Sequence, residues 1–404
     1  MKIYIAVNGL GLGHIVRCHA IAKKLMESGS EVLFATYLDG LDFARRQGLR
    51  VVQSIPISYQ VRSDGSVDLK ATSARIGLSL GVNRFLHQLV RELKYLKSYA
   101  PDVVLVDSRL STLLAARLLR KPVATILNQY RILLLHNNKY PRHGILDKVF
   151  VLIARLGWTF FGVLISEAWC LSETIFIPDF PPPLTISRDN LAIPIRRRRK
   201  MKFVGPIVNP NFRDGVDRAG LFRKYGLKPN KLMIYAAISG PRHEREPLVK
   251  KLVPLLAKFP SDYNIVISCG NPNGLNSPRH QGGALVFEWA DEQDAFLNVC
   301  DVVISRAGHG TILKAMTLGK PLLIIPTPFQ TEQLANATAA RSIGIAMLLD
   351  QRALSMESLI EAITLLANKR TYTQRAIEVS QVAEKFEATT ECSRMIKRLA
   401  ADTS

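Results

Sequence analysis

The sequence predicts an α/β protein with two doubly wound, mainly parallel domains that face each other across a cleft. Short apolar segments alternate with amphipathic helical segments up to about residue 180, and the same alternation restarts near residue 203. A proline-rich stretch, Pro178-Asp-Phe-Pro-Pro-Pro183, separates the two series. Strands that alternate with helices are typical of parallel sheets covered on both faces. At 404 residues the chain is long enough for two such domains.

The first domain is assigned to residues 1–185. Its strands are expected near residues 2–8, 31–36, 51–55, 103–107 and 123–127. Its helices are expected near residues 14–28, 40–47, 82–99 and 109–120. Residues 186–205 are predicted to be a linker, because the prolines interrupt regular structure and a polar, basic stretch follows them.

The second domain is assigned to residues 206–375. Its strands are expected at residues 232–237, 264–268, 284–287, 302–304 and 321–326, with helices between them. Residues from about 371 to 402 form one amphipathic helical stretch. We expect its last part, residues 376–404, to cross back to the first domain.

The composition indicates an anionic partner. The chain has 54 Lys and Arg against 33 Asp and Glu, a net charge of +21. Because no nucleic-acid-binding motif occurs, no nucleic acid partner is expected, and a membrane surface or a phosphorylated substrate is preferred. Five scattered cysteines without a CxxC pair, and a strand that starts at residue 2, favour a cytoplasmic protein.

A glycine-rich turn, Gly9-x-Gly11-x-Gly13-His14, follows the first strand and leads into a helix. Glycines let the backbone turn tightly and approach a ligand closely. A dinucleotide site is the rival interpretation, but it needs G-x-G-x-x-G and an acidic residue about 20 residues further on. Here the third glycine comes one residue early and Glu31-Val-Leu-Phe-Ala-Thr36 has no acid at its end. We therefore expect His14 at the mouth of a ligand crevice.

Residues 149–165 are apolar except for one central arginine, Arg155. A membrane span is disfavoured, because the segment is short and an arginine at its centre is costly. Two interpretations stay open: a buried helix, or a helix in the membrane interface, which Trp158, Trp169 and the flanking Lys148 favour. The basic run 196–200 is either simply solvated or bound to anionic headgroups.

Ser305-Arg-Ala-Gly-His-Gly-Thr-Ile-Leu-Lys-Ala-Met-Thr-Leu-Gly-Lys-Pro-Leu-Leu-Ile-Ile-Pro326, followed by Phe329-Gln-Thr-Glu-Gln333, resembles the donor-site signature of nucleotide-sugar glycosyltransferases. The chain is similar to the MurG and UDP-glucuronosyltransferase families, and its start, Gly11-Leu-Gly-His-Ile-Val-Arg17, resembles a Gly-Leu-Gly-His-x-x-Arg subgroup. The resemblance implies the GT-B fold, with two Rossmann-like domains. It covers most of both domains.

The donor is expected to bind in the second domain. A strand at 302–304 enters a small-residue turn and then a helix, whose first N–H groups suit a diphosphate. The resemblance implies that Glu332-Gln333 grip the sugar hydroxyls and that the backbone near Phe287-Glu-Trp289 holds the base. The expected donor-binding residues are Ser239, Gly240, Phe287, Trp289, Arg306, Gly308, His309, Gly310, Thr311, Glu332 and Gln333. Glu332 can instead be an ordinary first-turn carboxylate, and His309 only a turn residue.

One position departs from the family pattern. Lys314 stands where the family usually has a glutamate that holds the ribose hydroxyls. A lysine cannot accept those hydrogen bonds, which puts the nucleotide preference in doubt.

His14 is the expected catalytic base, and Asp107, at the end of the strand 103–107, is expected to orient it. Gly11, Gly13 and Arg17 are expected to complete an acceptor or phosphate turn. Alternative roles are helix capping or packing for His14 and a helix N-cap for Asp107. No Asp-x-Asp motif occurs, so no metal and no cofactor are expected; the nucleotide sugar is a substrate.

The sequence therefore predicts an inverting glycosyltransferase that uses a UDP-sugar. The expected acceptor is a lipid or a lipid-linked saccharide at the cytoplasmic face of an anionic membrane, to which the protein binds peripherally. Two other functions stay open: hydrolysis of a nucleotide sugar in the same site, and a non-catalytic subunit that binds nucleotide sugars.

Overall fold

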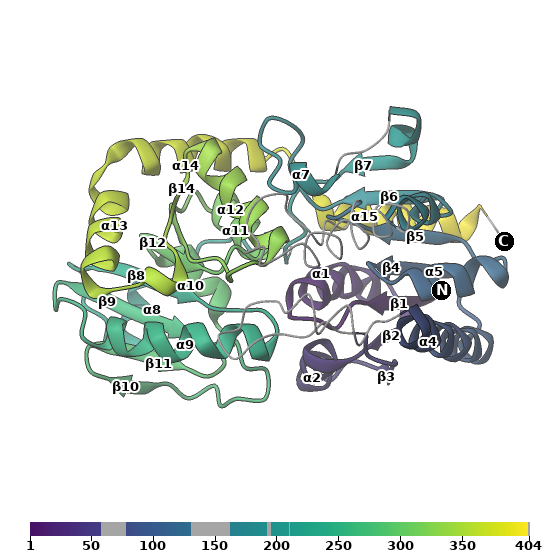
Figure 1. Cartoon of the computed structure of the whole chain (residues 1–404), viewed down its shortest axis with the longest axis horizontal. Coiled ribbons are helices and arrows are strands. Elements are labelled where there is room, and N and C mark those ends of the chain that lie inside the picture. The colour runs from purple at the N-terminus through teal and green to yellow at the C-terminus, as the bar shows by residue number, and fades with distance from the viewer. Residues whose placement is uncertain (58–77, 131–161, 192–194, 210, 403–404) are drawn as a thin grey trace, which may run out of the picture.

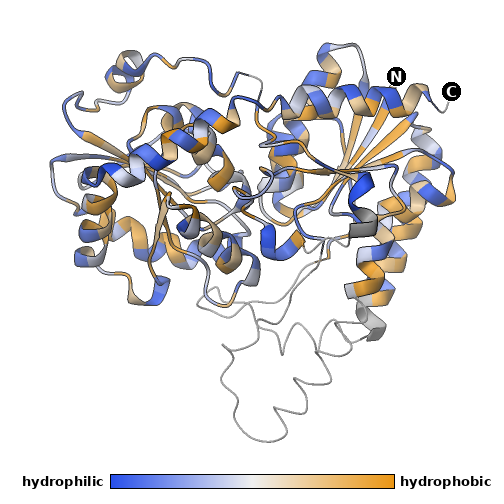
Figure 2. Ribbon diagram, turned by 90° about the horizontal axis from the view of Figure 1, so that it is seen from above, coloured by the Kyte–Doolittle hydropathy of each residue, from blue (hydrophilic) through white to orange (hydrophobic). Residues whose placement is uncertain are grey.

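A computed structural model describes residues 1–57, 78–130, 162–191, 195–209 and 211–402. It confirms the predicted α/β class with two Rossmann-like domains, which lie side by side in Figure 1. Each domain has a seven-stranded sheet in the described residues. In Figure 2 the apolar strands lie inside each domain, between helices that carry both apolar and polar residues.

The first sheet has the strand order β3-β2-β1-β4-β5-β6-β7, and all its pairings are parallel. Its strands are β1 (Lys2–Val7), β2 (Glu31–Thr36), β3 (Val51–Gln53), β4 (Val103–Asp107), β5 (Val123–Ile126), β6 (Thr174–Ile177) and β7 (Met201–Phe203). The last of these lies in the segment that the sequence predicted to be linker. Domain boundaries at residues 185, 205 and 375 stay predictions.

Helices cover both faces of the first sheet, because its strands are apolar on both sides. Side chains of β1 alternate between the two faces: Ile3 and Ile5 pack with α1 (Gly13–Glu27), whereas Tyr4 packs with α4 (Leu78–Tyr99) and α5 (Leu110–Leu118). The helix α2 (Leu38–Arg46) follows β2. Strands buried on both faces are typical of parallel sheets.

The second sheet has the order β10-β11-β9-β8-β12-β13-β14, in which β10 alone pairs antiparallel. Its strands are β8 (Leu232–Ala237), β9 (Tyr263–Ser268), β10 (Arg279–Gln281), β11 (Ala284–Phe287), β12 (Val302–Ser305), β13 (Leu322–Ile324) and β14 (Ala346–Leu348). Its helices are α8 (Arg218–Lys224), α9 (Arg242–Ala257), α10 (Gln293–Val299), α11 (His309–Thr317), α12 (Thr331–Ile343), α13 (Met356–Asn368) and α14 (Arg370–Ala383).

Both sheets have a switch point, where neighbouring strands lead into connections that run in opposite directions. In the first sheet it lies between β1 and β4, and in the second between β8 and β12. Ligands of open α/β sheets bind at the carboxyl ends of the strands at this point. The turns that follow β1, β8 and β12 line one cavity between the domains.

The C-terminal end differs from the single helical stretch that the sequence predicted. Two helices form, α14 and α15 (Ala388–Ala401), because the chain turns between them where Phe386 packs against Gly205 and Phe180. Gly205 has φ of 81°, and a Cβ there would lie 2.6 Å from the Phe386 side chain. The helix α15 then packs on α1 through Cys392 and Ile396, and Figure 1 shows it beside the first sheet.

The apolar segment 149–165 lies mostly outside the described residues, since its placement is given only from residue 162, where a helix runs to residue 169. No helix within the described ranges is long and apolar enough to span a membrane.

Candidate active site between the domains

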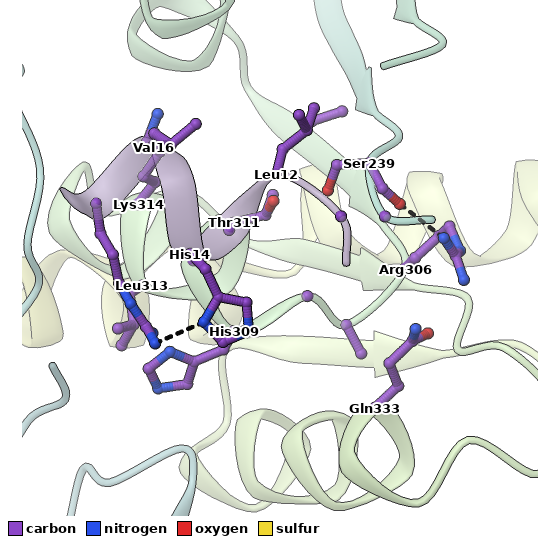
Figure 3. Close-up of a pocket in the computed structure, with 18 of the residues that line it drawn as sticks. Leu12, His14, Val16, Ser239, Arg306, His309, Thr311, Leu313, Lys314 and Gln333 are labelled. Atoms are coloured by element: carbon purple, nitrogen blue, oxygen red, sulfur yellow. Dashed lines mark hydrogen bonds between the residues drawn. The ribbon is translucent and has the colours of Figure 1, made fainter. Parts of the chain in front are cut away.

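A cavity of about 350 Å³ lies between the carboxyl edges of the two sheets. The first domain lines it with the turn after β1, the start of α1 and the residues after β5. The second domain lines it with the residues after β8 and β12 and with the start of α12. Figure 3 shows side chains from both domains in this cavity, with Leu12, His14 and Val16 on the first-domain turn and helix.

Three helices begin at the cavity. The first residues of α1, α11 and α12, among them His14, His309 and Glu332, line it. The N-terminal N–H groups of a helix carry partial positive charge and attract anions. A cavity that receives three helix starts is therefore suited to a phosphate or diphosphate.

Two glycine turns meet across the cavity. Gly11 has φ of 69°, and a Cβ on it would lie 3.2 Å from the Cα atom of Gly240. Gly240 has φ of 110°, and a Cβ on it would lie 2.4 Å from the guanidinium of Arg306. Glycine is required at both positions by the positive φ and by the close approach. Gly13 has open space around its Cα, so packing does not explain that glycine.

The two predicted catalytic residues lie in contact. The Nδ1 atom of His14 is 2.8 Å from Oδ1 of Asp107, and His14 lines the cavity with 23% of its side chain exposed. Register explains the contact: Asp107 at the end of β4 pairs with Val7, directly before the glycine turn. Because a carboxylate only accepts, we assign the Nδ1 proton to His14, which leaves Nε2 as the basic nitrogen.

A role for Arg17 in an acceptor or phosphate turn stays a prediction. In the structure Arg17 lines the cavity and holds Asp107. Its Nε and Nη2 atoms donate to the two carboxylate oxygens of Asp107 at 2.5 and 2.6 Å. Arg17 Nη2 also lies 3.0 Å from His14 Nδ1, so a cation stands beside the imidazole. Since Arg17 follows His14 by three residues on α1, both side chains emerge on one helix face.

Asp107 is fully buried and ionised. Burial alone would raise its pKa, but the charges of Arg17 and His14 and their hydrogen bonds outweigh burial and hold the pKa well below its usual range. The Asp107 side chain does not cap α5, whose N-cap residue is Arg109. Its carboxylate instead faces α1, where it can fix the ring of His14.

On the donor side, Arg306 and Gln333 line the cavity but are held by a buried acid. Glu244, in the first turn of α9, accepts from Arg306 Nη2 at 2.5 Å and from Gln333 Nε2 at 3.0 Å. Arg306 Nη1 also donates to the carbonyl of Ser239 at 2.7 Å, as Figure 3 shows. The side-chain amide oxygen of Gln333, Oε1, accepts from the backbone N–H of Thr327 at 2.9 Å. Glu244 therefore neutralises the Arg306 charge close to the cavity.

His309 and Lys314 also line the cavity and have acidic partners. His309 Nε2 lies 3.1 Å from Oδ2 of Asp179, which follows β6 and is fully buried. Lys314 Nζ donates to Oδ1 of Asp294 at 2.5 Å. The lysine that replaces the family glutamate therefore has a carboxylate beside it. Gly308, Gly310, Thr311 and Glu332 line the same cavity.

Phe287 and Trp289 do not line this cavity. Phe287 is buried in the core of the second domain. Trp289 is buried against α2 of the first domain: its ring packs on Phe43, and the guanidinium of Arg46 lies 5.3 Å from the ring centre. Their side chains are occupied by packing, and a role for the backbone of this segment in holding the base stays a prediction.

The helix α2 fastens the first domain to the second. Arg46 donates to the carbonyls of Pro272 and Gly274 at 3.1 and 2.8 Å. Asp39 accepts from the backbone of Gly11 and from Arg245 of α9, at 3.3 Å in each case. The glycine turn and the second domain are thus held by one carboxylate.

Three site residues were missed from the sequence: Asn128, Asp179 and Glu244. Asn128 and Asp179 follow β5 and β6 closely, at the same sheet edge as Asp107, so their position after a strand was a usable signal. Glu244 had no such signal, because its partners come from distant segments. Among the described residues, no group of three or more His, Cys, Asp or Glu side chains is placed to hold a metal ion.

Two family models match the chain. Residues 246–391 match the glycosyltransferase family 28 C-terminal domain, and residues 1–156 match glycosyl transferase family 1. An uncharacterized glycosyltransferase of Methanosarcina acetivorans is 29% identical over 357 residues, with 86% of each chain covered. The UDP-N-acetylglucosamine--N-acetylmuramyl-(pentapeptide) pyrophosphoryl-undecaprenol N-acetylglucosamine transferase of Clostridium botulinum is 23% identical over 381 residues, 92% of each chain.

Solved structures share the fold. MurG of Acinetobacter baumannii superposes with a TM-score of 0.57 at 20% identity and covers 98% of both chains. The spinosyn rhamnosyltransferase SpnG superposes with a TM-score of 0.67 at 18% identity, over 98% of this chain and 100% of that one. Together with the family models and the relatives that align over most of their length, this shows that the chain is a glycosyltransferase of the GT-B fold, similar to MurG.

Proposed function

We propose that this glycosyltransferase moves a sugar from UDP to a lipid or lipid-linked acceptor at the cytoplasmic face of the membrane, with inversion at the anomeric carbon. The observation that carries the proposal is the His14–Asp107 pair, which stands on the first-domain wall of a cavity that receives three helix starts. A base on one wall and an anion site on the other are what direct displacement of a diphosphate requires.

In this mechanism, Nε2 of His14 takes the proton of the acceptor hydroxyl as its oxygen attacks the anomeric carbon. The bond from that carbon to the diphosphate oxygen breaks, and the electron pair leaves with UDP. Asp107 keeps Nδ1 protonated and stabilises the imidazolium that forms. Arg17 holds both oxygens of Asp107, so the carboxylate has one fixed orientation.

The leaving diphosphate is stabilised by the start of α11, with Gly308, Gly310 and the hydroxyl of Thr311 on the cavity wall. Arg306 contributes less charge than its position suggests, because Glu244 pairs with it. In this proposal the start of α11 therefore contributes more than Arg306 to the stabilisation of the leaving diphosphate.

Two observations support a lipid-linked acceptor and a membrane. The C. botulinum relative carries a pyrophosphoryl-undecaprenol acceptor in its name and aligns over 92% of its length. On α4, Val82, Leu86 and Val90 are each about half exposed and recur every four residues, so they form one apolar stripe. Exposed basic residues occupy the same helix: Arg84, Arg91, Lys94 and Lys97. An apolar stripe among cations suits an anionic membrane surface.

Incubation of the protein with labelled UDP-sugars, with and without an undecaprenyl-pyrophosphoryl saccharide, tests the reaction. Label that appears in the lipid fraction only when the acceptor is present is the expected result. Release of free sugar at the same rate without acceptor would show hydrolysis instead and would contradict the proposed transfer.

Co-sedimentation with vesicles tests the membrane surface. The chain should bind vesicles rich in phosphatidylglycerol, and replacement of Val82, Leu86 and Val90 by Glu should abolish binding. Ile377→Glu, at a residue of α14 that is 47% exposed, is the matched control and should bind normally. Equal binding of the triple variant and the control would refute a role for the α4 stripe.

A further inference from the structure

Asn128 links the catalytic pair of the first domain to the second domain. It lies two residues after the end of β5 and is 4% exposed. Its amide oxygen accepts from Arg17 Nη2 at 3.2 Å, and its amide nitrogen donates to Oε1 of Glu332 at 3.0 Å. The orientation of the amide is determined by its partners, because a guanidinium only donates and a carboxylate only accepts.

We propose that Asn128 is a positioning residue for donor-sugar recognition: it holds the Glu332 carboxylate where that carboxylate contacts the sugar. The proposal rests on the proposed function and on the role that the family resemblance implies for Glu332, which is to accept hydrogen bonds from sugar hydroxyls. The first domain, through Asn128, thereby sets the sugar contact that the second domain makes.

The geometry gives Glu332 a defined orientation. Asn128 donates to one carboxylate oxygen of Glu332, Oε1. Because Glu332 lines the cavity, its second carboxylate oxygen is the one proposed to accept from the sugar. Glu332 lies in the first turn of α12, so the helix start favours its charge. The cation of Arg17 is also close enough to interact with the charge of Glu332. Burial, the largest effect, lowers the pKa of Arg17, but the charge of Asp107 and its hydrogen bond raise it, and the charge of Glu332 raises it further, so that the pKa lies above its usual value.

The link has a consequence for the reaction. Arg17, which holds Asp107 beside His14, and Glu332, which is proposed to hold the sugar, contact the two ends of one amide group. In this proposal the anomeric carbon is placed relative to the base only when Asn128 contacts both Arg17 of the first domain and Glu332 of the second. When the Asn128 amide is lost, Arg17 keeps its two hydrogen bonds to Asp107. Loss of the Asn128 amide should therefore change sugar recognition more than folding.

Titration calorimetry with UDP, UDP-glucose, UDP-galactose and UDP-N-acetylglucosamine tests the proposal. Asn128→Asp keeps the bond to Arg17 but sets a carboxylate against Glu332. We expect it to bind UDP as the unmodified chain does, and to lose about tenfold or more of the added affinity that the preferred sugar provides, as for one hydrogen bond to a charged group. Asn230→Asp, at an exposed turn residue, is the charge-matched control.

A double variant separates positioning from general damage. In Asn128→Asp with Glu332→Gln, the new amide at position 332 can donate to the new carboxylate at position 128, so the sugar-dependent affinity should partly return. Unchanged sugar preference in Asn128→Asp would overturn the inference while the proposed function stands, and so would equal affinity of the unmodified chain for UDP and all three sugars. A chain that does not bind UDP would overturn the proposed donor, and this inference with it.

Discussion

Asp107→Asn removes the one charge that holds both Arg17 and His14. The carboxylate is fully buried and accepts three hydrogen bonds from these two residues, at 2.5, 2.6 and 2.8 Å. An amide offers one acceptor oxygen, and its NH₂ group faces donors. Because Arg17 is left buried without its counter-charge, the free energy of unfolding should fall by about 3–5 kcal/mol. The kcat of transfer should fall by about 10²–10⁴, since the base loses its orientation.

The pH dependence of this loss gives a second measurement. Because the pKa of Asp107 is lower in the folded chain than the unfolded value of about 3.9, its contribution is complete above that value and is lost as the pH falls through the folded pKa. Urea denaturation should therefore show the largest difference between the unmodified chain and the variant at pH 7, and a smaller one below about pH 4. Asp402→Asn, in an exposed ion pair, is the control. A loss under about 1 kcal/mol at pH 7, as for a surface pair, would refute the reasoning.

Two further substitutions test how the domains meet. Gly240→Ala places a Cβ 2.4 Å from the Arg306 guanidinium at a φ of 110°, so it should cost about 1–3 kcal/mol in urea denaturation and weaken UDP binding. Gly215→Ala, where a Cβ has open space, should change neither the free energy of unfolding nor the affinity for UDP. Arg46→Ala loses two bonds to second-domain carbonyls, and we expect a loss of about 1–3 kcal/mol and faster proteolysis between the domains. Arg45→Ala, at an exposed neighbouring residue, should leave the free energy of unfolding and the rate of proteolysis unchanged. If the two arginine variants had the same stability and the same rate of proteolysis, the contact of α2 with the second domain would not hold the domains together.

Local patterns were sufficient to predict the elements that carry the catalytic pair. Alternating apolar segments predicted β1 and β4, and the parallel pairing of these neighbours brings His14 and Asp107 together at one edge. Such contacts are predictable because they depend on strand order and strand ends.

Contacts between distant segments were not predictable in this way. Arg17 was predicted to complete an acceptor or phosphate turn, but no local pattern indicated its partner Asp107, a buried carboxylate 90 residues away. Trp289 belongs to a segment that resembles a base-binding one, yet its side chain packs on the other domain. The break between α14 and α15 depends on Phe386 fitting against Gly205, which is also a tertiary contact.

The most direct test of the central claim is the transfer rate of His14→Ala, with a labelled UDP-sugar and a polyprenyl-pyrophosphoryl acceptor. The account predicts that kcat falls by about 10²–10⁴ while the affinity for UDP is unchanged, because His14 takes the acceptor proton. His14→Gln should be as slow, since an amide cannot act as the base. Transfer by either variant at the rate of the unmodified chain would contradict the account.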